Sequence, residues 1–134
     1  TGDKMETWTA EVLPASFNAN NDDNASFDGR SDNSGPEPEG VTVGRFFGRT
    51  YAFVGLERVG GIMVFDLSDP SAPSPVLYRN DRDFDGVPED GSAGDLGPEG
   101  LTLISLADSP SSDPLLAVTN EVSGTTTIYA IVQK

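Results

Sequence analysis

The chain has 134 residues, with 22 acidic and 8 basic side chains and a formal net charge of −14. This charge argues against nucleic acid as a partner, because phosphate binding needs a basic surface. The absence of cysteine and histidine excludes disulfides, thiolate metal sites and a cysteine nucleophile, and it removes the usual general base. The length suits one domain, and apolar runs such as "IMVF" are too short for membrane insertion.

The first 36 residues are expected to hold one strand and a long loop. The segment "METWTAEVL" (Met5–Leu13) is interpreted as a strand that completes the second of two repeated sheets farther along the chain. Residues 15–35 carry almost no apolar side chains and are rich in Asn, Asp, Ser and Gly, which is typical of loops. Within them, Asp28, Arg30 and Asp32 are expected to hold the loop in place through charge-assisted hydrogen bonds.

Two copies of one unit follow this loop. "EPEGVTVG" from Glu37 matches "GPEGLTLI" from Gly97, and "YAFVGLERVGGIMVFDL" from Tyr51 matches "LLAVTNEVSGTTTIYAI" from Leu115. Each copy contains short runs rich in β-branched and aromatic residues, separated by Gly, Pro, Asp and Ser, and it lacks helical periodicity. The "VGG" and "VSG" triplets predict tight hairpin connections at equivalent places in the two copies.

This pattern predicts an all-β chain that forms part of a β-propeller, with two antiparallel four-strand blades. A meander of about four strands is what one propeller blade needs. We expect a single β domain over residues 1–134, with the strand and acidic loop at 1–36, the first blade at 37–80, an acidic calcium-type loop at 81–96 and the second blade at 97–134. A small sandwich of two similar sheets is the alternative architecture.

The stretch "NDRDFDGVPEDG" between the two copies collects acidic side chains that repel one another unless a cation lies among them. Its D-x-D-x-D-G spacing is typical of calcium loops, in which alternate carboxylates converge on one hard cation and glycine permits the turn. The twelfth position is Ser92 rather than Glu, so the loop is not an EF-hand. We expect one Ca²⁺ bound by Asp81, Asp83, Asp85, the Val87 carbonyl, and Glu89 or Asp90. A solvated loop is the alternative.

Two glutamates recur in both copies and are candidate ligand-binding residues. Glu39 and Glu99 lie in the repeated "PEG" motif, and Glu57 and Glu121 end a repeated strand. Each of the four either binds a metal or ligand or fixes its own turn by accepting backbone hydrogen bonds. Arg58 has no basic counterpart, because Val122 occupies its place in the second copy. It either contacts an anion or pairs with Glu39 or Glu57.

Four segments give a specific resemblance: "GPEPEGVTVG", "RTYAFVGLERVGGIMVFDLSDP", "GDLGPEGLTL" and "NEVSGTTTIY". They resemble the C-terminal part of the choice-of-anchor I family, which are large exported bacterial proteins with a β-propeller body. Some members carry alkaline-phosphatase-like or cell-surface glycoprotein names. The resemblance implies an extracellular, periplasmic or cell-surface location. It also implies that these residues are the last blades of a propeller, partnered by the remaining blades or by another copy of the chain.

Two functional hypotheses stand at this point. The first is a secreted or cell-surface propeller module, stabilised by calcium, that serves binding or scaffolding. The second is part of a metal-dependent phosphoesterase-like propeller, of the alkaline-phosphatase-like or phytase-like kind, which would hydrolyse phosphoric esters. The second needs several carboxylate-bound metals and cationic side chains for the phosphate, and the chain has only 8 basic residues. For this chain alone, the sequence therefore favours the binding or scaffolding module over an enzyme.

Overall fold

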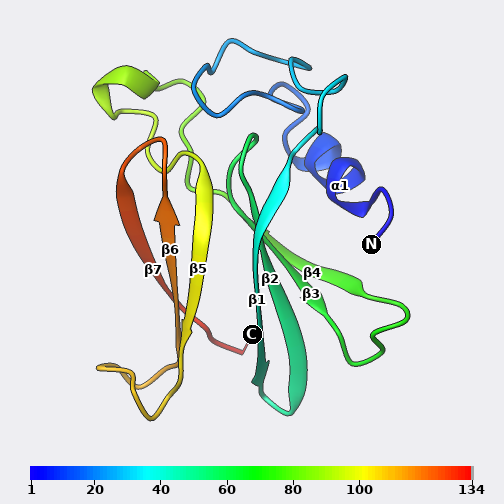
Figure 1. Ribbon diagram of the computed structural model, residues 1–134, viewed down its shortest axis with the longest axis vertical. Coiled ribbons are helices and arrows are strands. Elements are labelled where there is room, and N and C mark those ends of the chain that lie inside the picture. The colour runs from blue at the N-terminus through cyan, green and yellow to red at the C-terminus, as the bar shows by residue number, and fades with distance from the viewer. Residues whose placement is uncertain (134) are drawn as a thin grey trace.

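The computed structural model describes residues 1–133 and consists of two antiparallel sheets and one α-helix (Figure 1). The first sheet has the strand order β1-β2-β3-β4, and the second sheet has the order β5-β6-β7. The elements are α1 (Lys4–Val12), β1 (Pro38–Phe46), β2 (Arg49–Leu56), β3 (Ile62–Asp66), β4 (Ser74–Arg79), the 3₁₀-helix η1 (Pro88–Asp90), β5 (Pro98–Ile104), β6 (Leu115–Asn120) and β7 (Thr125–Ala130). Every strand pairs with its sequence neighbour, so both sheets are meanders.

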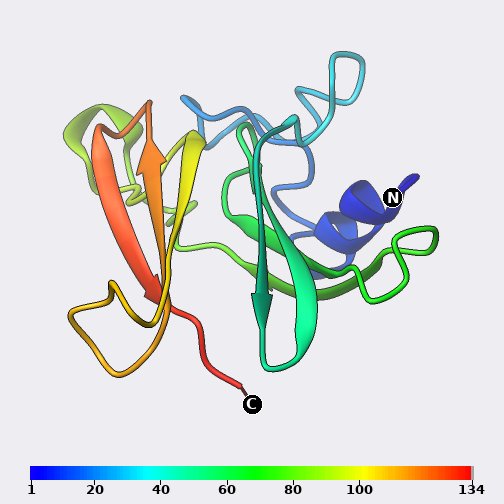
Figure 2. The same ribbon diagram turned by 60° about the horizontal axis from the view of Figure 1, so that its bottom comes forward.

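The two sheets pack against each other with β1 and β2 next to β5 (Figure 2). Glycines permit this approach, because a Cβ atom at Gly55 would lie 2.7 Å from the carbonyl oxygen of Pro98. The core between the sheets is formed by apolar side chains of β2, β3 and β6, namely Phe53, Ile62, Val64, Leu116 and Val118. Burying these side chains is the main favourable term that joins the two repeats.

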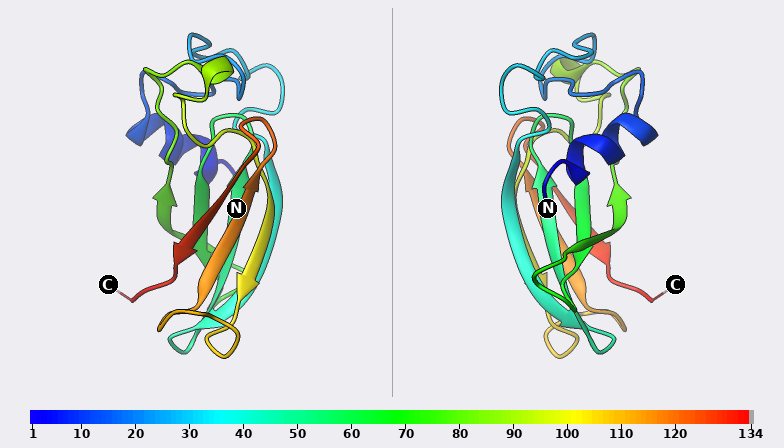
Figure 3. Two further views of the ribbon diagram at one scale, coloured as in Figure 1. Left: turned by 90° about the vertical axis from the view of Figure 1, so that its left-hand side faces the viewer. Right: turned by 90° about the vertical axis from the view of Figure 1, so that its right-hand side faces the viewer.

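Helix α1 covers the other face of the first sheet, away from the second sheet (Figure 3). Met5 and Trp8 of the helix, together with Leu13 just after it, pack against a core that includes Met63 and Phe65. The strand expected at Met5–Leu13 is therefore wrong in type and in place. Its apolar residues Met5, Trp8 and Leu13 contact the first sheet rather than complete the second.

The internal repeat is confirmed by the backbone hydrogen bonds of the two sheets. The amide of Glu57 donates to the carbonyl of Glu37 at 2.9 Å, and the amide of Glu121 donates to that of Gly97 at 2.8 Å. The turns after β2 and β6 close alike, since the amides of Gly60 and Gly124 each donate to the carbonyl four residues earlier. The two segments "YAFVGL" and "LLAVTN" thus occupy equivalent central strands.

The β-rich prediction is confirmed, and the finer prediction of a propeller stays a prediction. The first sheet has the four strands expected of a blade, but the second has three within residues 1–133. These described residues form two packed sheets rather than a closed ring. The division into segments at 1–36, 37–80, 81–96 and 97–134 stays a prediction, and Lys134 lies outside the described residues.

Candidate functional site

Two long loops gather at one end of the sheets and form a polar platform (Figure 1). The first spans residues 14–37 and connects α1 to β1, and the second spans residues 80–97 and connects β4 to β5. They meet through Asn24, whose side-chain amide donates to the carbonyls of Asp83 and Gly86 at 2.9 and 2.7 Å. We call these two segments the loop platform. It contains the predicted acidic loop and most of the ionisable side chains discussed below.

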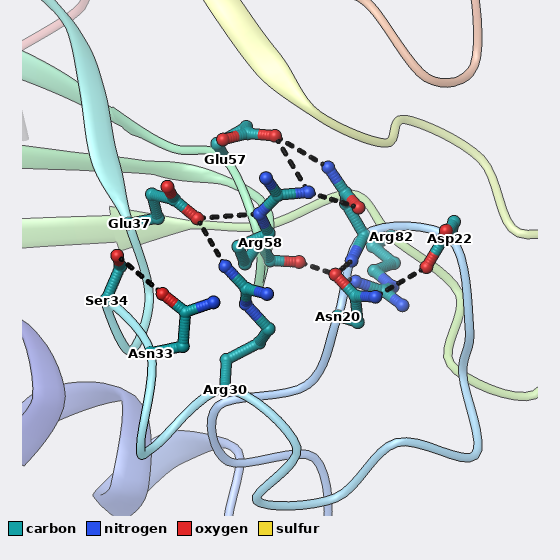
Figure 4. Close-up of polar contacts among 10 residues, drawn as sticks. Asn20, Asp22, Arg30, Asn33, Ser34, Glu37, Glu57, Arg58 and Arg82 are labelled. Carbon is teal, nitrogen blue, oxygen red and sulfur yellow. Dashed lines mark hydrogen bonds and ion pairs between the residues drawn. The ribbon is translucent and has the colours of Figure 1, made fainter.

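A cluster of ion pairs holds the first platform loop onto the turn after β2 (Figure 4). The Glu37 carboxylate accepts hydrogen bonds from Arg58 at 2.6 Å and from Arg30 at 3.0 Å. These arginines hold the pKa of Glu37 below its ordinary value, with the Arg58 hydrogen bond as the main cause. The structure therefore confirms that Arg30 ties the loop down through a charge-assisted bond.

Glu57 is the buried member of the cluster, with 3% of its surface exposed. Its carboxylate accepts a hydrogen bond from Asn21 at 2.8 Å and pairs with Arg58 at 3.1 Å. Burial raises the pKa of Glu57, and the nearby charges of Glu39 and Glu121 add to this despite the opposing effect of Arg58. Burial requires these partners, since an unpaired buried carboxylate is costly. The predicted ion pair between Arg58 and Glu57 is confirmed.

Arg82 is a second buried anchor, and the sequence analysis did not single it out. Its guanidinium donates twice to the Asn24 side-chain oxygen, at 2.6 and 2.9 Å, and once to the Arg58 carbonyl at 2.9 Å. It also lies over the Phe84 ring, 4.6 Å from the ring centroid. Burial lowers the pKa of Arg82 to about 10. Its place inside the acidic run was the available signal, because a lone cation there suggests a neutralising role.

The structure assigns separate local roles to several predicted calcium ligands. Asp81 pairs with Arg79 at 2.5 Å and accepts a hydrogen bond from the Tyr129 hydroxyl at 3.0 Å. Asp83 accepts a hydrogen bond from the amide of Asp85 at 2.9 Å, and Asp90 accepts one from the amide of Ser92 at the same distance. Such Asx turns fix the local backbone.

The remaining predicted ligands are exposed, namely Asp85, Val87 and Glu89. Within residues 1–133, no three acidic side chains gather as one metal-binding group. The loop as it stands would therefore have to rearrange in order to bring its carboxylates around one ion.

The repeated glutamates diverge in their surroundings. Glu39 and Glu99 lie near the start of the equivalent strands β1 and β5, and both are exposed. Glu57 is buried in the ion-pair cluster, whereas Glu121 is exposed. The two residues therefore differ in their side-chain surroundings, although their backbone positions are equivalent.

A shallow polar cleft of about 550 Å³ opens between the two platform loops. Its walls include Asn20, Asp22 and Asp23 from the first loop and Glu89 from the second. Three of the described lining residues, Asp22, Asp23 and Glu89, are acidic and none is basic. The cleft is therefore electronegative, and it is suited to cations rather than to phosphate or other anions.

Comparison with known proteins shows the family of this chain. The sequence profile of the choice-of-anchor I domain matches residues 1–70, which is just over half of the chain. The chain belongs to the choice-of-anchor I family. It is also 30% identical to Gigasin-3a of Magallana gigas over 78% of this chain and 39% of that protein. The chain thus spans well under half the length of this curated relative. No solved structure matches the chain.

Family membership indicates a surface-associated or extracellular module. Within residues 1–133, no helix has both the length and the apolar character needed to cross a membrane. The prediction that the chain corresponds to the C-terminal blades of a longer family member stays a prediction.

Proposed function

We propose that this chain is a binding or scaffolding module of an extracellular or cell-surface protein, and that the loop platform is its working face. The observation that carries the proposal is the ion-pair cluster of Glu37, Glu57, Arg30 and Arg58. Such a cluster fixes a long polar loop in one position on a β scaffold, which is how binding loops are commonly presented. The family's surface association supports the same reading.

Surface exposure can be tested in intact cells of the source organism. An epitope tag inserted after Phe47, in the exposed β1–β2 turn opposite the platform, should be cleaved by external protease. A cytoplasmic marker protein is the control and should stay intact. Protection of the tag in intact cells, with cleavage only after lysis, would contradict the proposed location.

We further propose that Ca²⁺ stabilises the loop platform through the predicted ligands Asp81, Asp83, Asp85, Val87 and Glu89 or Asp90. Support comes from the charge of −14, the spacing of the acidic loop and the electronegative cleft beside Glu89. All candidate ligands are oxygen atoms, which favours calcium over zinc or copper. Cation binding would relieve the repulsion within the loop and draw its carboxylates together.

Thermal melting with Ca²⁺ and with a chelator tests the calcium proposal. Wild-type protein should melt at a higher temperature in Ca²⁺ than in chelator. Binding should add about 2.7 kcal/mol of stability when Ca²⁺ is at a hundredfold excess over its dissociation constant. Asp83→Ala should lose most of this gain. Asp69→Ala is the matched control, because Asp69 also closes an Asx turn, with Ser71, but lies in the β3–β4 connection. Equal melting of the wild type in both conditions would remove calcium from the proposal.

The phosphoesterase alternative gains no specific support from the described residues. The arginines that would have to hold a phosphate group are engaged with carboxylates or amides of the protein itself. A binding module therefore remains the function that the geometry supports best.

A further inference from the structure

The two platform loops lie together at one end of the sheets in both views of Figure 3, and the Asn24 side chain joins them. Its Nδ2 atom donates to the carbonyls of Asp83 and Gly86 at 2.9 and 2.7 Å. Its Oδ1 atom accepts two hydrogen bonds from the Arg82 guanidinium, at 2.9 Å from Nε and 2.6 Å from Nη2. Both polar atoms of this amide are therefore engaged by the second loop.

Arg82 is held by neutral acceptors, although it lies between Asp81 and Asp83 in the sequence. Its Nη1 atom donates to the carbonyl of Arg58 at 2.9 Å, and its guanidinium lies 4.6 Å from the centroid of the Phe84 ring. The residue is only 7% exposed. Within residues 1–133, no ion pair with a carboxylate involves Arg82. The charge of Arg82 is thus kept apart from the carboxylates of the acidic loop.

Arg79 shows how an exposed arginine behaves beside this loop. Its side chain is 62% exposed and pairs with the Asp81 carboxylate at 2.5 Å. Because Asp81 is one of the predicted calcium ligands, this pair already places one internal cation on the loop. If the Asn24 acceptor were lost, we expect Arg82 to pair with the neighbouring carboxylates in the same way, since a buried charge without an acceptor is costly.

We propose that Asn24 decides which cation neutralises the acidic loop. By holding the Arg82 guanidinium, it prevents this internal cation from occupying the carboxylates that Ca²⁺ needs. Asn24 and Arg82 are therefore positioning residues for the calcium site rather than ligands. Two cations that compete for the same carboxylates bind with negative coupling, so freeing Arg82 should weaken Ca²⁺ binding. The inference rests on the proposed calcium site and names a device that regulates it.

Isothermal titration calorimetry with Ca²⁺ on the full 134-residue chain tests the proposal. Asn24→Ala should weaken Ca²⁺ binding by about tenfold, within the usual range for coupled sites. Adding Arg82→Gln should restore most of the affinity, because the internal competitor is removed. The gain from Arg82→Gln should be smaller in the wild-type background, where Asn24 already holds the guanidinium. A merely structural role gives the opposite result, since loss of a second buried anchor would disturb the loop further.

Arg45→Gln is the matched control for the change in charge. It also removes one positive charge, but Arg45 is exposed and lies opposite Thr50 beside the β1–β2 turn, away from the platform. Combined with Asn24→Ala, it should leave Ca²⁺ binding weak. Asn33→Ala controls for the loss of an exposed asparagine from the first loop, and it should change the affinity by less than about twofold. Circular dichroism of all variants verifies that the sheets are intact.

A second measurement needs no variant, because NMR can observe the arginine Nε–H groups of the wild type directly. Added Ca²⁺ should shift the Nε–H resonance of Arg79, since the ion takes Asp81 from it. The Nε–H resonance of Arg82 should stay in place, because its hydrogen bonds to Asn24 persist in the calcium-bound protein.

Three results would overturn the inference. They are equal Ca²⁺ affinity in wild type and Asn24→Ala, no recovery of affinity on adding Arg82→Gln, and a shift of the Arg82 resonance as large as that of Arg79. If the wild type binds Ca²⁺ and any of these is found, only this inference fails. If the wild type binds no Ca²⁺, the proposed calcium site fails and the inference fails with it, whereas the proposed surface location is not affected.

Discussion

The turn after β2 and the turn after β6 make equivalent backbone hydrogen bonds but different side-chain contacts. The amides of Arg58 and Val122 both donate to the loop before their sheet, at 3.2 Å in each case. Yet Arg58 forms ion pairs with two carboxylates, whereas Val122 is 40% exposed. The repeat thus reproduces the hydrogen bonds, while the attached loop determines which side chains become buried.

The residues that precede the two sheets show the same divergence. Glu37 and its equivalent Gly97 both have positive φ, at 53° and 71°. Glycine adopts this conformation readily, but a glutamate is strained in it by about 1 kcal/mol or more. The hydrogen bonds from Arg30 and Arg58 offset that strain. Only the first repeat has a long polar loop to hold, and only there does a charged residue replace glycine.

The largest expected effect separates the cores of the two repeats. Phe65 is 1% exposed beneath α1, whereas its equivalent Tyr129 is only partly buried against the core between the sheets. Phe65→Ala should cost about 3–5 kcal/mol of unfolding free energy, because it leaves a cavity that the surroundings only partly fill. Tyr129→Ala should cost clearly less. Urea denaturation of both variants makes the comparison, and equal losses would show that the two cores are equally closed.

An intermediate effect separates the two turns. Arg58→Ala should destabilise the protein by about 1–3 kcal/mol, since it leaves the buried Glu57 carboxylate without its cation. Val122→Ala, at the equivalent position, should change stability by less than about 0.5 kcal/mol. Denaturation midpoints at neutral pH measure both. Similar small losses of stability in the two variants would mean that the ion-pair cluster contributes little to the stability of the protein.

The smallest expected effect depends on pH. The pKa of Glu37 is lowered, chiefly by the hydrogen bond from Arg58. Glu37 therefore contributes stability above its unfolded pKa of about 4.3, and this contribution is lost as pH falls through the lower folded pKa. Glu37→Gln should cost about 1 kcal/mol at pH 7, and this cost should shrink as the pH is lowered from 7 towards 3.

The measurement is the stability difference between wild type and Glu37→Gln over this pH range. A stability difference that stays constant over this range would mean that the charge of Glu37 does not contribute to stability. Gly97→Ala serves as a comparison at the equivalent position. This variant should destabilise the protein at every pH, because the loss of stability comes from the positive φ at residue 97 rather than from a titrating group.

Local sequence was sufficient to predict the strands and the turns that join them. The runs within Tyr51–Leu67 and Leu115–Ile131 alternate β-branched, aromatic and small residues, and glycine marks each turn. The structure places β2, β3, β6 and β7 there. These features depend on residues that are neighbours in the sequence, and the same pattern occurs in both copies of the repeat. The pairing of Arg58 with Glu57 was equally accessible, because the two residues are adjacent.

Only the tertiary structure decided how the N-terminal residues are used. The segment at Met5–Leu13 contains residues compatible with strand or helix, and its packing against Met63 and Phe65 selects the helix. Glu37, Asn21 and Arg82 become anchors because the chain brings residues more than twenty positions apart together. No local pattern encodes such a meeting, since burial and charge pairing depend on which surfaces the folded sheets leave uncovered.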